Sequence, residues 1–89
     1  QRDTLPDVGL FPTRTPGPTV LDYFAAHEGH VGVFVFDQGD TLRFERDLGR
    51  LRQARVPLDL GALPQGRYAV VVRCDGREVQ RRRLRIVRD

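Results

Sequence analysis

The sequence contains no serine, no lysine and only one cysteine, Cys74. A single cysteine cannot form an internal disulfide, and its place in a valine-rich run favours a buried, inert thiol. The absence of serine removes the commonest nucleophile of hydrolases. No apolar run approaches the roughly 20 residues that a membrane-spanning helix needs, so we expect no stable membrane insertion. No threonine or cysteine has a histidine or acid at a persuasive spacing for a nucleophile, and we expect a non-enzymatic domain without a cofactor.

The positive charge of the chain is carried entirely by arginine. The 15 arginines face 12 acidic residues, for a formal net charge of +3. Arginine pairs in bidentate fashion with carboxylates, so its exclusive use permits a salt-bridged surface. A GC-rich genome produces the same bias without a physical purpose. Because the net charge is modest and no aromatic residues interleave with the C-terminal arginines, we expect no nucleic-acid partner. For Arg81–Arg88 we expect a solvated or receptor-facing edge, and contact with an anionic lipid surface or a glycan stays open.

The length of 89 residues predicts one domain near the lower size limit of a single hydrophobic core. Residues 1–7 are polar and predict a linker or lead-in, and residues 8–89 predict the folded domain. The sequence has no initiating methionine and no charged-then-apolar leader. We therefore expect a piece of a longer protein whose export signal lies elsewhere.

Turn residues divide the chain into short apolar runs, which predict strands and no helix. The unbroken run Val31–Phe36 predicts a central strand that is covered on both sides. Turns are expected at His27–His30 and around Gly39, which is free to take a positive φ, and Asp47–Gln53 predicts a long connection. The fold class expected is all-β, a small Ig-like antiparallel β-sandwich of about seven strands.

The last two strands flank Asp75-Gly76, which predicts a two-residue hairpin turn. Continuing the register from that turn would set Val72 opposite Val79 and would point the next arginines into the core. Leu84 and Ile86 have the opposite parity. We therefore expect a β-bulge between Gln80 and Arg83 that turns Leu84 and Ile86 inward.

Other polar clusters have simple structural explanations. His27 and His30 are three residues apart around a glycine, which fits a surface loop better than a helical zinc motif. Asp37 and Asp40, with Glu45 nearby, are too few for a calcium loop, so we expect aspartates that cap their own turn and no metal site. At the Leu-Pro-x-Gly corner, Tyr68 is expected to pack its ring and to bond a backbone group through its hydroxyl.

Four motifs occur in the order and spacing of a known family. The first is aromatic-Pro at Phe11–Arg14, and the second is an aromatic-Asp turn at Phe36–Gly39. The third is Leu-x-x-Gly-x-Tyr at Leu63–Tyr68, and the fourth is a basic, alternating last strand at Arg81–Arg88. Nearly the whole chain therefore resembles the type A C-terminal sorting domain of type IX secretion substrates. Thr13 and Arg14 depart from the family's usual Asn and Pro, and Gly39 falls one residue early.

The resemblance implies a cleavable signal that is recognised by the outer-membrane secretion translocon and cut by a surface sortase. Its location would be the periplasm in transit and then the cell surface or the extracellular space. An exposed last strand would offer unpaired backbone groups for strand addition, or for a homodimer by edge pairing. The motif residues so implicated are Phe11, Pro12, Asp37, Gly39, Leu63, Pro64, Gly66 and Tyr68. Those of the last strand are Arg81, Arg82, Arg83, Leu84, Arg85, Ile86, Val87 and Arg88.

A second function class stays open. An Ig-like accessory module could remain on a surface protein and bind glycan or pack on a neighbouring catalytic domain. Exposed aromatic residues on a flat face would favour it, and the candidates are Phe11, Tyr23 and Phe44.

Overall fold

The computed structural model describes residues 5–88, and these residues form six strands and no helix. The all-β class is therefore confirmed, and no helix in this range could cross a membrane. Residues 1–4 of the expected lead-in lie outside the described residues, as does Asp89, and Asp7 already belongs to the first strand. The strands are β1 (Asp7–Phe11), β2 (Arg14–Thr15), β3 (Pro18–Asp37), β4 (Leu42–Asp59), β5 (Gly66–Cys74) and β6 (Arg77–Ile86).

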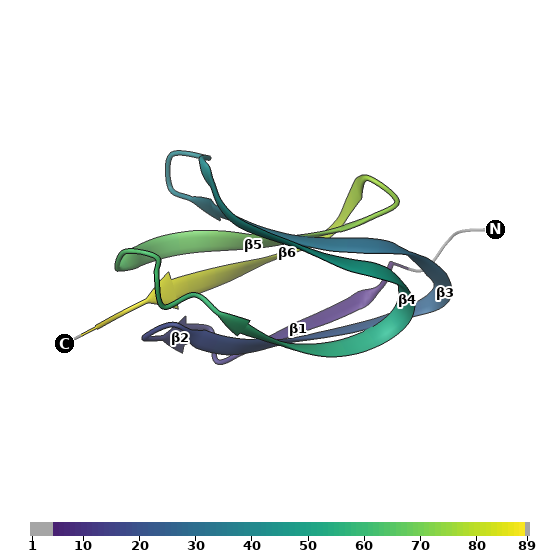
Figure 1. Cartoon of the computed structure of the whole chain (residues 1–89), viewed down its shortest axis with the longest axis horizontal. Coiled ribbons are helices and arrows are strands. Elements are labelled where there is room, and N and C mark those ends of the chain that lie inside the picture. The colour runs from purple at the N-terminus through teal and green to yellow at the C-terminus, as the bar shows by residue number, and fades with distance from the viewer. Residues whose placement is uncertain (1–4, 89) are drawn as a thin grey trace.

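Two long strands, β3 and β4, run through both layers of the molecule. The first part of β3 pairs with β1 and with the second part of β4, whereas its second part pairs with β5 and with the first part of β4. Between Phe24 and Gly29 the ladder is irregular, and residues 25–28 lie opposite only Arg52. The sheet bends there and folds over itself, so a single sheet supplies both layers of a small sandwich (Figure 1).

Two segments that were predicted to separate strands are instead parts of strands, so these two predictions are wrong. The turn expected at His27–His30 is the bend inside β3, and the connection expected at Asp47–Gln53 is part of β4. Both segments are polar because their side chains are largely exposed, and polarity alone does not separate an exposed strand from a loop. These two mergers, together with the short additional β2, give six strands where about seven were expected.

The core lies between the two layers and is built mainly from aliphatic side chains. Val31, Val33 and Val35 of β3 are fully buried and face Val70 and Val72 of β5. Because this segment pairs with β4 and with β5, Val31–Phe36 is confirmed as a central strand. The expected cover on both sides is wrong, since Phe34 and Phe36 on its other face are only half-buried. The opposite layer contributes the side chains of Val8, Leu10, Leu21, Tyr23, Val56 and Leu58.

The parity switch expected in the last strand is present, one residue earlier than predicted. Asp75 and Gly76 both have positive φ values, 54° and 81°, which confirms the two-residue turn. The register then shifts so that Arg73 pairs with Glu78 and Val72 with Gln80, which leaves Val79 as the extra residue. The bulge turns Leu84 and Ile86 inward, where they are 2% and 0% exposed.

The last strand is not a free edge, contrary to expectation. Its end pairs in parallel with β2, and the backbone amide of Arg85 donates to the carbonyl of Thr13 at 2.7 Å. Farther back, the side chains of Gln80 and Arg82 donate to the carbonyls of Pro6 and Val8, next to β1 and within it, at 2.9 and 3.1 Å. The expectation of an exposed last strand failed because β2 and the segment around β1 are distant in the sequence and no local pattern indicates them as partners. The long unpaired edge among residues 5–88 is that of β4, which pairs only with β3.

Candidate functional site

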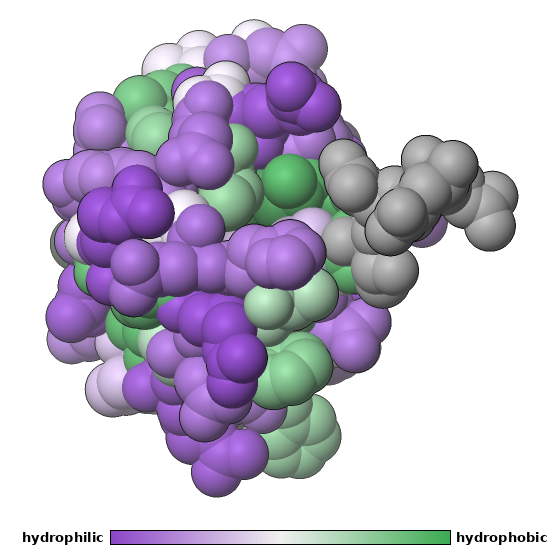
Figure 2. Space-filling model, turned by 90° about the vertical axis from the view of Figure 1, so that its right-hand side faces the viewer, coloured by the Kyte–Doolittle hydropathy of each residue, from purple (hydrophilic) through white to green (hydrophobic). Residues whose placement is uncertain are grey.

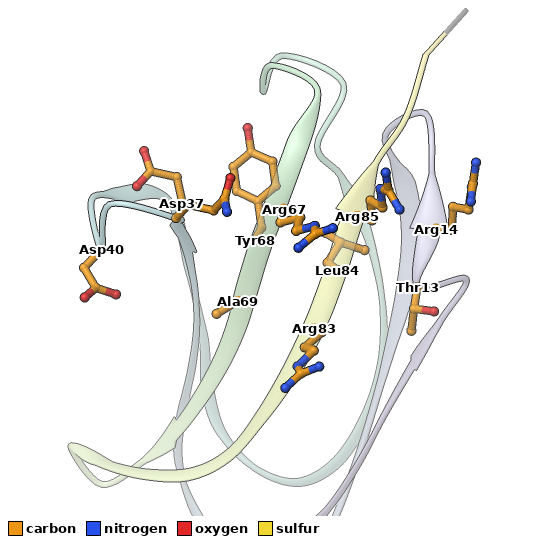
Figure 3. Close-up of a pocket in the computed structure, with 11 residues that line it drawn as sticks. Thr13, Arg14, Asp37, Asp40, Arg67, Tyr68, Ala69, Arg83, Leu84 and Arg85 are labelled. Carbon is orange, nitrogen blue, oxygen red and sulfur yellow. The ribbon is translucent and has the colours of Figure 1, made fainter.

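An open groove of about 850 Å³ lies at the end of the molecule that carries the C-terminus. Its walls come from four segments that are far apart in the sequence: residues 13–14, 37–40, 67–69 and 83–85. Each of these segments falls within or beside one of the four motifs found in the sequence. The loop before β2, the β3–β4 turn and the β4–β5 loop all lie at this end (Figure 1), and Figure 3 shows their side chains around the groove.

The Leu-Pro-x-Gly corner lies next to the wall that Arg67, Tyr68 and Ala69 form, and its expected construction is confirmed. Tyr68 is 7% exposed, and its hydroxyl donates to the carbonyl of Pro64. Leu63 is buried in the core, and Gly66 begins β5 opposite Ile86. Tyr68 therefore holds the corner through its buried ring and its hydroxyl, and the same residue lines the groove.

The β3–β4 turn is held by the carboxylate of Asp37. Its Oδ1 accepts the backbone amides of Gly39 and Thr41 at 2.9 and 3.0 Å, which confirms an aspartate that caps its own turn. Its Oδ2 lies 3.5 Å from the guanidinium of Arg43. The positive φ expected at Gly39 is instead at Asp40, with φ 63°. Aspartate tolerates this conformation better than most residues, so Gly39 is not required for it.

Hydrogen bonds of two threonine side chains hold the proline-rich segment, residues 12–18. Thr19 is buried and donates to the carbonyl of Pro12 at 2.7 Å, close to the cis Phe11-Pro12 peptide bond. Thr15 is also buried, and its hydroxyl bonds within the segment. Phe11 is 80% exposed and does not line the groove, so the structure places it apart from Tyr68 and Asp37.

The arginines of the last strand fall into three kinds. Arg82 and Arg88 donate to backbone carbonyls and thereby act as clamps. Arg81 forms a bidentate pair with Glu78, and this hydrogen bond lowers the pKa of Glu78 and raises that of Arg81. Only Arg83 and Arg85 point into the groove. Leu84 and Ile86 are core residues, and the backbone amide of Val87 donates to Thr15.

Two further arginines in the groove were missing from the set predicted to recognise a partner. Arg67 is the direct cross-strand neighbour of Arg85, and Arg14 of β2 pairs with Arg85 from the other side. The outward parity of Arg67 could have identified it, because it alternates with buried Tyr68 and Val70. Arg14 carries no such signal, because its position depends on the parallel pairing of β2 with β6.

The aromatic residues do not form a flat binding face. Tyr23 is 2% exposed and Phe44 packs partly against the core, so both are wrong as glycan candidates. On the outer face, Arg73 stacks 4.5 Å from the ring centroid of Phe34. Figure 2 shows the end where β3 and β4 bend: hydrophilic residues cover most of it, and hydrophobic ones form separate patches.

The histidine cluster forms an ordinary surface contact. His30 Nε2 lies 2.7 Å from Asp47 Oδ1, and both side chains are exposed. Among residues 5–88, no three His, Cys, Asp or Glu side chains are arranged to hold a metal ion. Cys74 is half-buried rather than fully buried.

The groove is therefore an open depression in which four of the eleven lining residues are arginine, and its walls are joined by backbone pairing and by the packing of Tyr68. No family model, no curated protein and no solved structure matches this chain.

Proposed function

We propose that this chain is a non-enzymatic C-terminal secretion and sorting domain of the type IX class. It would be recognised by outer-membrane export machinery and cut from its cargo at the cell surface, after transit through the periplasm. The single observation that carries this proposal is the groove. Segments within or beside the four motifs supply its walls, and Asp37 and Tyr68 are the motif residues that line it together with Arg83–Arg85 of the last strand. Such a meeting of distant segments is the arrangement expected of one recognition surface.

The rigidity of this end supports recognition by shape. Tyr68 holds the corner through Pro64, Asp37 holds the β3–β4 turn, and Arg88 clasps the loops on either side. A preformed surface loses little conformational entropy when it binds. β2 and the side chains of Gln80 and Arg82 cover much of the edge of β6. We therefore propose that the receptor binds the groove, and not that it adds a strand to β6.

The strand to which another extended chain could add is β4. Its outer edge is unpaired over Leu42–Asp59 among the described residues, and such an edge accepts another extended chain. Either a receptor strand or a second copy of the domain would fit this description. Arginines are frequent along β4, including Arg43, Arg50 and Arg52, so an acidic strand is the better electrostatic match.

The test is a fusion of residues 1–89 to a secreted reporter in a host that has the type IX pathway. Surface delivery is expected with the domain and not without it. Ala69→Gln, which fills the groove wall beside Arg83 without changing charge, is expected to reduce delivery strongly. Ala26→Gln makes the same chemical change on an exposed position at the bend and serves as the matched control.

Equal delivery of the reporter with and without the domain would refute the proposal. Equal delivery by the Ala69 and Ala26 variants would refute the groove as the recognition surface. Deleting Leu84–Asp89 is a poorer test, because Leu84 and Ile86 are core residues and their loss would unfold the domain. Mass spectrometry of the exported protein would show whether the domain is removed, as proposed, or retained as in an accessory module.

The accessory-module alternative has less support. Phe11 and Phe24 are the exposed aromatics of the β1–β3 layer, at 80% and 52% exposure. Their register separates them by four residues along the strands, or about 13 Å. The Asp22–Arg55 ion pair lies on the same layer between their positions. This spacing does not form one continuous stacking platform for a sugar.

A further inference from the structure

Three arginines lie side by side across three neighbouring strands. Arg67 of β5 pairs with Arg85 of β6, and Arg85 pairs with Arg14 of β2. Residues that pair directly in a ladder point to the same face, with Cβ atoms about 4.5–5.5 Å apart. Arg83 lies on that face two residues before Arg85. In Figure 3 these four side chains rise from β5, β6 and β2 along one wall of the groove. We refer to Arg14, Arg67, Arg83 and Arg85 as the arginine row.

The members of the arginine row lack partners, and among residues 5–88 they share this only with Arg77, which lies alone at the far end of β6. Among residues 5–88, Arg14, Arg67, Arg83 and Arg85 form no ion pair and donate no side-chain hydrogen bond. Almost every other arginine in this range has an acidic partner, a backbone carbonyl or an aromatic ring. Those with such a partner are Arg43, Arg46, Arg50, Arg52, Arg55, Arg73, Arg81, Arg82 and Arg88.

Like charges placed directly opposite each other in a sheet destabilise it. Acids that could offset this charge are few in the groove. Asp37 is already engaged by Arg43, and Asp40 lies with it on the opposite wall. The domain thus tolerates a local excess of positive charge at one place, which is the arrangement expected of an anion site.

The arginine row suits a phosphate group better than a carboxylate. A carboxylate has two oxygens, and a single bidentate guanidinium satisfies both. A phosphate group presents three or more acceptor oxygens in a tetrahedral arrangement, so guanidinium groups on neighbouring strands can bind it together. The hydroxyl of Thr13, which also lines the groove, adds a neutral donor beside Arg14.

We propose that the arginine row binds a phosphate-class oxyanion, either free in solution or carried on a lipid headgroup. This goes beyond the export function and does not rest on it, because it follows from the partners, register and charge of the four arginines. The anion would lie over β6 between Arg67 and Arg14, on the side of the groove away from Asp40.

The test measures binding of inorganic phosphate and tripolyphosphate to the full chain by calorimetry and by thermal shift at low ionic strength. Saturable binding is expected, tighter for tripolyphosphate. Arg85→Gln and Arg67→Gln are each expected to weaken it by about tenfold, since each removes charge-assisted hydrogen bonds. Arg77→Gln is the matched control: it removes the same charge from the exposed far end of β6 and should change affinity less than about twofold.

A second arm identifies the source of the phosphate. Sedimentation with phosphatidylcholine vesicles, with and without phosphatidic acid, shows whether a lipid headgroup is bound through the same arginines. Binding in either arm that depends on Arg85 and Arg67 but not on Arg77 supports the site. No saturable binding in both arms, equal losses in all three variants, or equally tight and Arg85-dependent binding of hexaglutamate would overturn it. Export of the reporter is a separate readout, so either proposal can fail alone.

Discussion

Arg88 Nη1 donates to the carbonyl of Leu63 at 2.6 Å. The same guanidinium reaches the carbonyl of Gly61 at 2.8 Å and that of Pro16 at 2.9 Å. The final arginine of the described chain therefore joins the C-terminus to the β4–β5 loop and to the proline-rich segment. Its place in the basic last strand suggested recognition of a partner, but its hydrogen bonds are all internal to the domain.

Replacing Arg88 with leucine should destabilise the domain, because several backbone carbonyls lose a charged donor at once. We expect a loss of about 1.5–3 kcal/mol in the free energy of unfolding, the range for hydrogen bonds to a charged group. Urea denaturation followed by circular dichroism would measure it. Arg88→Lys should recover only part of the loss, because an ammonium group lacks the planar fork.

Arg83→Leu is the matched control for this prediction. It makes the same change on the same end of the chain, but Arg83 is exposed and has no described hydrogen-bond partner. Its free energy of unfolding should change by less than about 0.5 kcal/mol. Similar losses for the two variants would show that Arg88 acts through general charge rather than as a clamp.

Tyr68 should contribute to stability through both its ring and its hydroxyl. Tyr68→Phe removes only the hydrogen bond to Pro64 and is expected to cost about 1 kcal/mol. Tyr68→Ala also empties the space under the corner and should cost about 3–5 kcal/mol, enough to unfold much of so small a domain. A loss below 1 kcal/mol for the alanine variant in denaturant titration would contradict the observed burial.

Relief of the like-charge contact between Arg67 and Arg85 should stabilise the fold. Arg67→Thr places a good strand former in β5 and removes one of the facing charges, so a gain of about 0.5 kcal/mol is expected at low salt. The gain should shrink in about 1 M NaCl, where exposed charges are screened. Thermal denaturation at both salt concentrations measures it, and an unchanged or lower stability at low salt would mean that the charges do not repel appreciably.

Local patterns in the sequence predicted much of the fold. The Asp75-Gly76 turn, the corner around Tyr68 and the central strand at Val31–Phe36 each depend on residues close together in the chain. The polar segments at His27–His30 and Asp47–Gln53 were the failures. Their side chains are largely exposed on strands that bend, so hydrophobic periodicity carries no signal there.

The site was less predictable than the fold because residues distant in the sequence decide which arginines bond within the domain and which line the groove. Arg82 and Arg83 are adjacent in the sequence, yet one bonds the carbonyl of Val8 and the other lines the groove. The bulge at Val79 decides which of them faces inward, and its position could be predicted only to within a few residues. Arg14 joined the site through a two-residue strand that no sequence pattern indicates.

Tyr23 provides a pH-dependent test of the core. Its hydroxyl is buried with no hydrogen-bond partner among residues 5–88, and burial beside Cys74 raises its pKa from 10.0 to about 12. The folded state therefore holds the phenolic proton more tightly than the unfolded chain does. The resulting contribution to stability is complete below pH 10 and should be lost as the pH rises through about 12.

The variant Tyr23→Phe should remove this alkaline loss of stability. At neutral pH it is also expected to raise the free energy of unfolding by about 1 kcal/mol, because a hydroxyl buried without a partner is unfavourable. Ultraviolet titration of the remaining tyrosine in a Tyr68→Phe background isolates Tyr23, since the chain has only these two tyrosines. If Tyr23 titrated near pH 10 in the folded protein, or if Tyr23→Phe were as sensitive to alkali as the parent, the hydroxyl would be in contact with solvent, and the packing of β3 against Cys74 at the bend would need revision.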